Sequence, residues 1–211
     1  IYVSVFAGDE ALGIPRDDEA VALWKELFKE RGIEAKDVFI GSEEDGYRVG
    51  MQGGRIFYYD AAKNWWSRSG KPSNMPAGEI GGPDSEVFYD FGSEHATHPV
   101  YGKLEPHPNS DSGQFLEIGN SVFIEYIKQE DGSFTKLPQR NVDFGGGLER
   151  IAAAQVGSPD GFRVDLLWNV VEHTEKLSGK KYEEKLIAFL VITHHLRGAL
   201  FLTRNVLPPG N

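Results

Sequence analysis

The stretch Asn141-Val142-Asp143-Phe144-Gly145-Gly146-Gly147-Leu148-Glu149-Arg150 decides the fold that the sequence predicts. A two-residue alternation precedes it and an apolar period of about 3.6 residues follows it, which indicates a strand that turns into a helix. Three consecutive glycines weaken a helix by about 1 kcal/mol each relative to alanine. They allow backbone N–H groups and the positive helix end to approach a ligand, although tight packing is the commoner reason for such a corner. Arg150, in the first helical turn, adds a planar cation suited to a phosphate or an adenine face.

The residues before this corner are typical of strands joined by turns. Asp17 is the expected N-cap of a helix that ends at Gly32. The segment 67–84 reads as a loop, because Gly, Pro, Ser and Asn are frequent in it. The pair Asp131-Gly132 predicts a hairpin turn. Strands are predicted at residues 2–6, 56–59, 87–89, 115–127 and 134–137.

The residues after the corner are typical of helices. We expect them at residues 148–154, 164–177 and 183–203. The predicted fold is therefore α+β, with an antiparallel sheet domain in residues 1–157 and an all-helical module that begins within residues 158–211. The last predicted helix is amphipathic, and we expect its apolar face to pack against residues 164–177.

The composition excludes several classes of protein. The chain has 211 residues and no cysteine, so it can bury a sizeable core but has neither disulfides nor thiolate metal sites. Its net charge of −10 argues against a broad electrostatic contact with nucleic acid. We expect no membrane span, because no apolar run approaches roughly 20 residues. Ile1 opens the chain without a signal pattern, which favours an internal piece of a cytoplasmic protein.

The glycine corner resembles motif 3 of the class II aminoacyl-tRNA synthetases, and its first residues resemble the alanyl-tRNA synthetase family in particular. Further segments resemble that family in the same order along the chain. They are Val3-Ser4-Val5-Phe6 with Gly8-Asp9-Glu10, Asn64-Trp65-Trp66, Gly82-Pro83-Asp84-Ser85-Glu86-Val87-Phe88-Tyr89-Asp90, Glu117-Ile118-Gly119-Asn120-Ser121-Val122-Phe123, and His195-Leu196-Arg197 through Leu207-Pro208. The resemblance implies a class II-type antiparallel sheet with flanking helices, followed by the start of a helical tRNA-recognition domain.

The resemblance also implies the activity of the intact protein. A member of this family is an ATP-dependent alanine–tRNA ligase, which forms alanyl-adenylate from alanine and ATP and transfers alanine to tRNA(Ala). ATP and Mg²⁺ are then the cofactors, and alanine, ATP and tRNA(Ala) are the partners. The family's motifs 1 and 2, with the arginine that contacts the α-phosphate, have no match in these 211 residues, so the chain alone is expected to be inactive.

The family pattern implies an alanine pocket built from four residues. Asp143 is implied as the partner of the alanine ammonium, and Gly145 leaves room beside it. Trp66 and Val122 are implied as the wall around the methyl group. Three of them have an ordinary alternative: Trp66 and Val122 could be core residues, and Asp143 could cap a turn.

The ATP site is implied by a second set of residues. Gly146, Gly147 and Arg150 match the ATP-binding part of motif 3, with Arg150 and Glu117 as the catalytic candidates. Glu117 and Asn120 match the positions that hold ATP-bound magnesium, and hard cations prefer such oxygen ligands. Residues three apart on a regular strand point to opposite faces, so this pair needs a β-bulge, which we predict at Gly119.

Two further groups of residues complete the expectations. Arg204 and Asn211 are candidates for contact with tRNA. His95, His98, His107, His194 and His195 lack the spacing of a metal site, so we interpret them as surface or packing residues and expect no structural metal.

The chain departs from the family pattern at four matched positions. Asp84 stands in place of a cysteine, Gly119 of a tryptophan, Phe144 of a threonine and Gly146 of a methionine. Two other classes of function remain open. One is a non-catalytic synthetase paralogue that binds an amino acid or a nucleotide, and the other is a domain used only for assembly.

Overall fold

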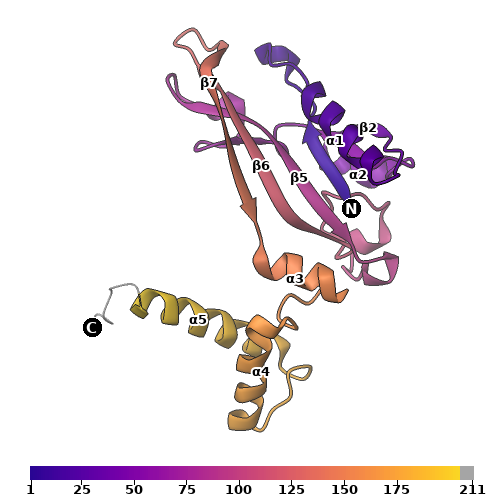
Figure 1. Cartoon of the computed structure of the whole chain (residues 1–211), viewed down its shortest axis with the longest axis vertical. Helices are drawn as coiled ribbons and strands as arrows, with labels where there is room; N and C mark the ends of the chain where they lie inside the picture. The colour runs from indigo at the N-terminus through magenta and orange to yellow at the C-terminus, as the bar shows by residue number, and fades with distance from the viewer. Residues whose placement is uncertain (205–211) are drawn as a thin grey trace.

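Among residues 1–204, seven strands form one mixed sheet in the order β2-β3-β1-β5-β6-β7, with β4 paired to β5 (Figure 1). This computed structural model describes residues 1–204. The strands are β1 Tyr2–Phe6, β2 Asp37–Gly41, β3 Ile56–Tyr59, β4 Trp65–Ser67, β5 Ile80–Asp90, β6 Phe115–Lys128 and β7 Phe134–Gly146. The predicted antiparallel pairing holds for β1, β5, β6 and β7, whereas β3 pairs in parallel with both β1 and β2.

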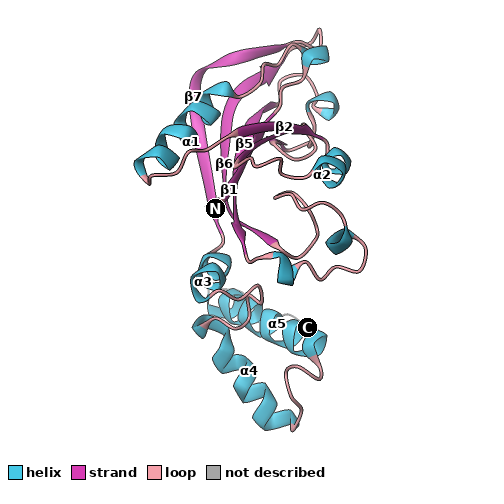
Figure 2. Ribbon diagram, turned by 90° about the vertical axis from the view of Figure 1, so that its right-hand side faces the viewer, coloured by secondary structure: helices cyan, strands magenta, loops and turns pink. Residues whose placement is uncertain are grey.

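Within the described part of the chain, five α-helices flank or extend the sheet: α1 Asp18–Glu30, α2 Glu43–Val49, α3 Leu148–Val156, α4 Asp165–Ser178 and α5 Leu186–Arg204. Helices α1 and α2 lie on opposite sides of the sheet (Figure 2). Helix α3 lies at the end of β7, and α4 and α5 lie beyond it, away from the sheet (Figure 1). The α+β class and the order of sheet and helices are as the sequence predicts.

Helix α1 covers one face of the sheet. The predicted N-cap is confirmed, because Asp17 accepts a hydrogen bond from the backbone N–H of Ala20 at 2.9 Å. The indole N–H of Trp24 donates to the hydroxyl of Ser85 on β5 at 2.8 Å. The core beneath the helix consists of Val3, Val5, Ala20, Val21, Phe28, Ile56 and Tyr58. We call this side of the sheet the α1 face and the other the open face.

The open face is covered over β1–β3, where His107 is fully buried, and over part of β5, where Asn109 Nδ2 donates to Glu86 Oε2 at 3.2 Å. His107 Nδ1 lies 2.8 Å from the hydroxyl of Tyr59, and the His107 ring fills the space above Gly46 of α2, where a Cβ would come within 2.7 Å. Burial lowers the pKa of His107 to about 4, so the ring is neutral near pH 7. His107 is therefore a packing residue, as predicted.

Strands β5, β6 and β7 form the antiparallel half of the sheet. The predicted hairpin between β6 and β7 is confirmed: Gly132 has φ +84° and its N–H donates to Gln129 O at 3.1 Å. Strand β7 continues well beyond residue 137 and leads directly into α3 (Figure 1). Strand β5 begins at Ile80, inside the segment predicted as a loop, so the last part of that prediction is wrong.

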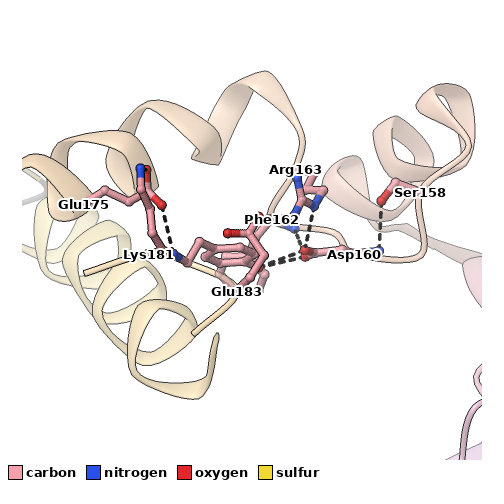
Figure 3. A network of polar contacts seen from close by, with 8 residues as sticks. Ser158, Asp160, Phe162, Arg163, Glu175, Lys181 and Glu183 are labelled. Atoms are coloured by element: carbon pink, nitrogen blue, oxygen red, sulfur yellow. Dashed lines mark hydrogen bonds and ion pairs between the residues drawn. The ribbon is translucent and has the colours of Figure 1, made fainter. Parts of the chain in front are cut away.

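The helical part has two small cores of its own. Ala153, Val164 and Leu167 form one, and Val171, Tyr182 and Phe189 form the other. Figure 3 shows a polar network between the segment that follows α3, helix α4 and the segment that precedes α5. In it, Asp160 accepts a hydrogen bond from the backbone N–H of Phe162 at 3.0 Å. Arg163 bridges Asp160 at 3.4 Å and Glu183 at 2.8 Å, and Lys181 pairs with Glu175 at 3.4 Å. The domain boundary after residue 157 remains a prediction.

Helix α5 differs from the sequence expectation in two ways. It does contact α4, as predicted, but Phe189 and Thr193 are its buried residues, whereas Leu196, Leu200 and Phe201 are more than half exposed. Within residues 1–204, α5 is also the one helix long and apolar enough to cross a membrane, with mean hydropathy 1.6. The expectation that no apolar run approaches that length was therefore wrong, although a single helix of this composition is weak evidence for a membrane span.

Candidate active site

The glycine corner lies where β7 passes into α3. The N–H of Gly147 donates to Ile118 O on β6 at 3.2 Å, and Ile151 N–H donates to Gly147 O at 2.8 Å, which opens the helix. None of the three glycines is in the left-handed region, so their role is steric. A Cβ at Gly147 would lie 2.9 Å from Cδ of Arg150, so glycine lets the arginine side chain fold back over the corner.

The structure brings Arg150 and Glu117 together. Arg150 Nη1 donates to the backbone carbonyl of Glu117 at 3.0 Å and to its Oε2 at 3.1 Å. Both side chains are partly exposed, with 51% of Arg150 and 35% of Glu117 accessible. The pair therefore contributes little to stability, but it fixes a cation and an anion side by side at the corner.

A β-bulge places Glu117 on the same face as Asn120. Gly119 pairs with Val87 and Glu117 pairs with Phe88, so Ile118 is the extra residue on β6. An extra residue reverses the alternation of side chains, and positions 117 and 120 then share a face. The predicted bulge is confirmed, one residue before Gly119. Asn120 in turn pairs with Gly145 on β7.

The predicted alanine residues lie in two adjacent cross-strand rows of the open face. In one row, Asp84 of β5 pairs with Val122 of β6, which pairs with Asp143 of β7. In the other, Asn120 pairs with Gly145. Residues directly opposite each other in a ladder point to the same side, so Asp143, Val122 and Gly145 share one surface. Asp143 is exposed, and a Cβ at Gly145 would meet no atom within 4 Å.

The two tryptophans of β4 have different environments. Trp65 is buried with Phe6, Met75 and Tyr126, whereas Trp66 is 44% exposed. The core interpretation therefore applies to Trp65 and not to Trp66. Trp66 pairs with Gly82, two residues before Asp84, which places it on the strand next to the row that contains Val122.

A buried polar network that was not predicted from sequence includes Asp84. Asn64 is fully buried, and its Nδ2 donates to Ser4 Oγ at 2.8 Å and to Asp84 Oδ1 at 3.0 Å. Ser4 Oγ donates to Glu86 Oε2 at 2.9 Å. Burial and the neighbouring charge of Glu86 raise the pKa of Asp84 to about 8, and burial raises that of Glu86. Asn64 and Asp84 both lie in segments that resemble the family, which is the one indication that the sequence offered. That the two side chains are in contact follows only from the pairing of the strands.

Three of the four departures from the family pattern are parts of one packing arrangement. The ring of Phe144 lies 3.3 Å from the place that a Cβ would take at Gly119 and 3.2 Å from that at Gly146. A side chain at either glycine would meet this ring. Phe144 itself is 64% exposed, so its ring lies over these two glycines at the surface of the sheet.

The oxygen atoms near Asn120 fit an ion that arrives with phosphate. Asn120 Oδ1 is buried and has no hydrogen-bond partner among residues 1–204, and Glu117 lies on the same face. Mg²⁺ commonly takes one or two protein oxygens and completes its shell with phosphate and water. No group of three or more His, Asp or Glu residues within 1–204 forms an independent metal site. Of the residues predicted to contact tRNA, Arg204 is exposed at the end of α5, and Asn211 lies outside the described residues.

A mixed seven-stranded sheet with flanking helices is consistent with the class II tRNA synthetase fold. The chain belongs to the family of class II tRNA synthetases (A), whose model matches residues 1–211. It is 32% identical over 200 residues to the alanine–tRNA ligase of Halalkalibacterium halodurans. That match covers 93% of this chain and 19% of the relative. It is 33% identical over 218 residues to the alanine–tRNA ligase of Rubrobacter xylanophilus, covering 100% of this chain and 21% of that protein. The chain thus spans about a fifth of the length of these relatives.

Proposed function

We propose that this chain carries part of the amino-acid-activating site of an alanine–tRNA ligase. The whole enzyme would join alanine to ATP, releasing pyrophosphate, and transfer the alanyl group to tRNA(Ala) in the cytoplasm. The observation that carries the proposal is the shared open face, on which Asp143, Val122 and Gly145 lie in register across β6 and β7.

The alanine pocket uses the open face directly. The carboxylate of Asp143 pairs with the alanine ammonium, and charge-assisted hydrogen bonds of this kind are the strong ones. Val122 lies beside Asp143 in the same row and offers an apolar contact for the methyl group. Trp66 closes the pocket from β4, and Gly145 leaves space for the substrate backbone.

The ATP site uses the corner. Arg150 approaches the phosphates or the adenine face, and its bond to Glu117 fixes its orientation before ATP arrives. Gly146 and Gly147 keep the backbone near the ligand free of side chains. Glu117 and Asn120 would hold a magnesium ion that neutralises phosphate charge. These residues bind and orient the reactants, and none of them forms a covalent bond with a substrate.

Alanine-dependent ATP–pyrophosphate exchange by the full-length protein tests the proposal. Among the twenty amino acids, alanine should give the highest kcat/KM, and Asp143→Asn should lower that value about tenfold or more, or about 1.4 kcal/mol. Asp131→Asn, in the exposed hairpin turn, is the matched control and should leave it unchanged. An unchanged kcat/KM in Asp143→Asn would remove Asp143 from the site. Binding of alanine without exchange would instead indicate a non-catalytic paralogue.

A further inference from the structure

Helix α5 is anchored by apolar packing in its first half only. Phe189 and Thr193 are its buried residues, and Phe189 packs against Tyr182 in the second helical core. Beyond Thr193, the helix borders an open groove of about 850 Å³ between α3, α4 and α5. Leu196 and Leu200 line this groove and are more than half exposed. Apolar packing therefore leaves the direction of the second half of α5 undetermined.

One ion pair fixes that second half. The guanidinium of Arg197 contacts the carboxylate of Glu149, the second residue of α3. Within residues 1–204, it is the one ion pair that joins residues 1–157 to residues 158–204. The side chain of Glu149 is 23% exposed and that of Arg197 is 40% exposed, so water and salt screen the pair only in part. The guanidinium carbon of Arg197 also lies 5.9 Å from the centre of the Phe201 ring, one turn further along α5.

Glu149 is itself fixed to the glycine corner. It lies two residues after Gly147, whose N–H donates to Ile118 O on β6. The next residue, Arg150, bonds to Glu117 on β6. Consecutive residues of a helix point about 100° apart, so one turn of α3 contacts the sheet through Arg150 and α5 through Glu149. The direction of α5 is thus tied to the candidate ATP site.

We propose that Glu149 and Arg197 are positioning residues for the transfer of alanine to tRNA, because their ion pair sets the direction of α5 relative to the glycine corner. The inference rests on the proposed function and extends it, since neither residue is assigned to a substrate there. The residues assigned to alanine and ATP lie on β4, β6, β7 and the start of α3. Formation of the adenylate therefore does not depend on the direction of α5, whereas the approach of tRNA to Arg204 does.

A small change in the direction of α5 is enough to affect transfer. From Thr193 to Arg204 the helix is about 16 Å long, at 1.5 Å per residue. A turn of about 10° moves Arg204 by about 3 Å. A misplacement of about 1 Å can cost an enzyme about 100-fold in rate. The ion pair itself is weak because it is partly exposed, so its loss leaves the fold intact and lowers the fraction of molecules with α5 in place.

Charge reversal in the full-length protein separates the two steps of the reaction. Arg197→Glu places two carboxylates side by side and should lower kcat/KM for tRNA(Ala) in aminoacylation about tenfold or more. Alanine-dependent ATP–pyrophosphate exchange should change less than about twofold. Glu149→Lys combined with Arg197→Glu exchanges the two charges, so kcat/KM for tRNA(Ala) should return to within about threefold of wild type. Arg140→Ala, which removes an ion pair with Glu19 on the α1 face, is the matched control and should change neither assay.

A distance measurement tests the direction of α5 independently of activity. Spin labels attached through Glu26→Cys on α1 and Leu202→Cys on α5, both at exposed positions, report the distance from the sheet to the far end of the helix. Residues 1–211 contain no cysteine, so only cysteines elsewhere in the full-length protein need replacement. Arg197→Glu should shift or broaden the distance distribution by about 3 Å or more, and the combined variant should restore it.

Each outcome supports or overturns the inference. Recovery in the combined variant supports positioning, because an arginine that binds a tRNA phosphate is not replaced by a lysine on α3. An unchanged distance distribution in Arg197→Glu, no recovery in the combined variant, or equal losses in exchange and aminoacylation would overturn the inference. If Arg197→Glu does not fold, Arg197→Gln should lower aminoacylation about threefold, and wild-type aminoacylation would overturn the inference. A wild-type protein without alanine-dependent exchange would contradict the proposed function, and the distance measurement would still decide whether the pair sets the direction of α5.

Discussion

Gly145→Ala should lower the activity of the candidate site without lowering the stability of the fold. Gly145 is not in the left-handed region, and an added Cβ would meet no atom within 4 Å. Alanine in a strand interior is favoured over glycine by roughly 0.5–1 kcal/mol, so the free energy of unfolding should stay the same or rise by about that amount. Denaturant unfolding of the protein measures this part.

The same methyl group should disturb activity. It would enter the open face, where Gly145 lies opposite Asn120 and two residues from Asp143. Crowding a packed contact costs about 1–3 kcal/mol, which corresponds to a fall of about 5- to 150-fold in kcat/KM for alanine in ATP–pyrophosphate exchange. Gly161→Ala, where a Cβ also meets no atom within 4 Å, is the matched control and should be neutral in both assays. Wild-type kcat/KM in Gly145→Ala would refute the placement of the substrate beside Asp143.

Three other predictions concern the corner, the sheet and the buried histidine. Arg150→Ala should lower kcat/KM for ATP about tenfold in exchange assays. Arg150→Lys should recover little of this activity, because Nη1 contacts two Glu117 oxygens and lysine lacks the planar guanidinium. Full recovery in Arg150→Lys would instead indicate a general effect of positive charge. Gly82→Ala should lower the free energy of unfolding by about 3 kcal/mol or more, since the added Cβ would lie 1.8 Å from the Phe123 carbonyl oxygen. Gly198→Ala is the control and should not destabilise the protein, because its Cβ would meet no atom within 4 Å. A loss below about 1 kcal/mol in Gly82→Ala would contradict the close approach of β5 and β6. His107 has a folded-state pKa of about 4, below that of an unfolded histidine. Its contribution to the free energy of unfolding is therefore fully present above the unfolded pKa, and it is lost as the pH falls from about 6.5 toward 4. Denaturant unfolding should show about 2 kcal/mol lost between pH 7 and 5, and this part should be missing in His107→Gln.

Strands with either alternating residues or a continuous run of aromatic and β-branched residues were predictable from sequence. Strands β1 and β3 match the predicted residues, and the Asp131-Gly132 turn and the Asp17 cap are also confirmed. These features depend on neighbours in the chain, because turn and cap hydrogen bonds close within a few residues. Local sequence was therefore sufficient.

The elements that sequence analysis missed depend on distant residues. Helix α2 has only seven residues and contains Gly46, and a glycine inside a short segment argues against a helix. The structure explains this glycine, because a Cβ there would lie 2.7 Å from the ring of His107. The start of β5 contains Gly81, Gly82 and Pro83, which locally favour a loop, but Gly82 is required for the close approach to β6.

The candidate site was predictable in its members but not in its arrangement. The family resemblance supplied Asp143, Glu117 and Arg150, and the need for a bulge followed from the alternation of strand residues. The bond between Arg150 and Glu117 joins residues 33 apart, and Asn64 meets Ser4 across 60 residues. Contacts at such separations depend on sheet register, which one sequence does not specify.

A crystal structure of the full-length protein with a non-hydrolysable alanyl-adenylate analogue is the most direct test of the central claim, that the open face of β6 and β7 binds alanine. We expect the ammonium nitrogen within about 3 Å of an Asp143 carboxylate oxygen, as in charge-assisted hydrogen bonds, with the methyl group against Val122. The adenylate phosphate should lie on the side of Arg150. An analogue bound on the α1 face, or on the open face with its ammonium held by a residue other than Asp143, would contradict the claim.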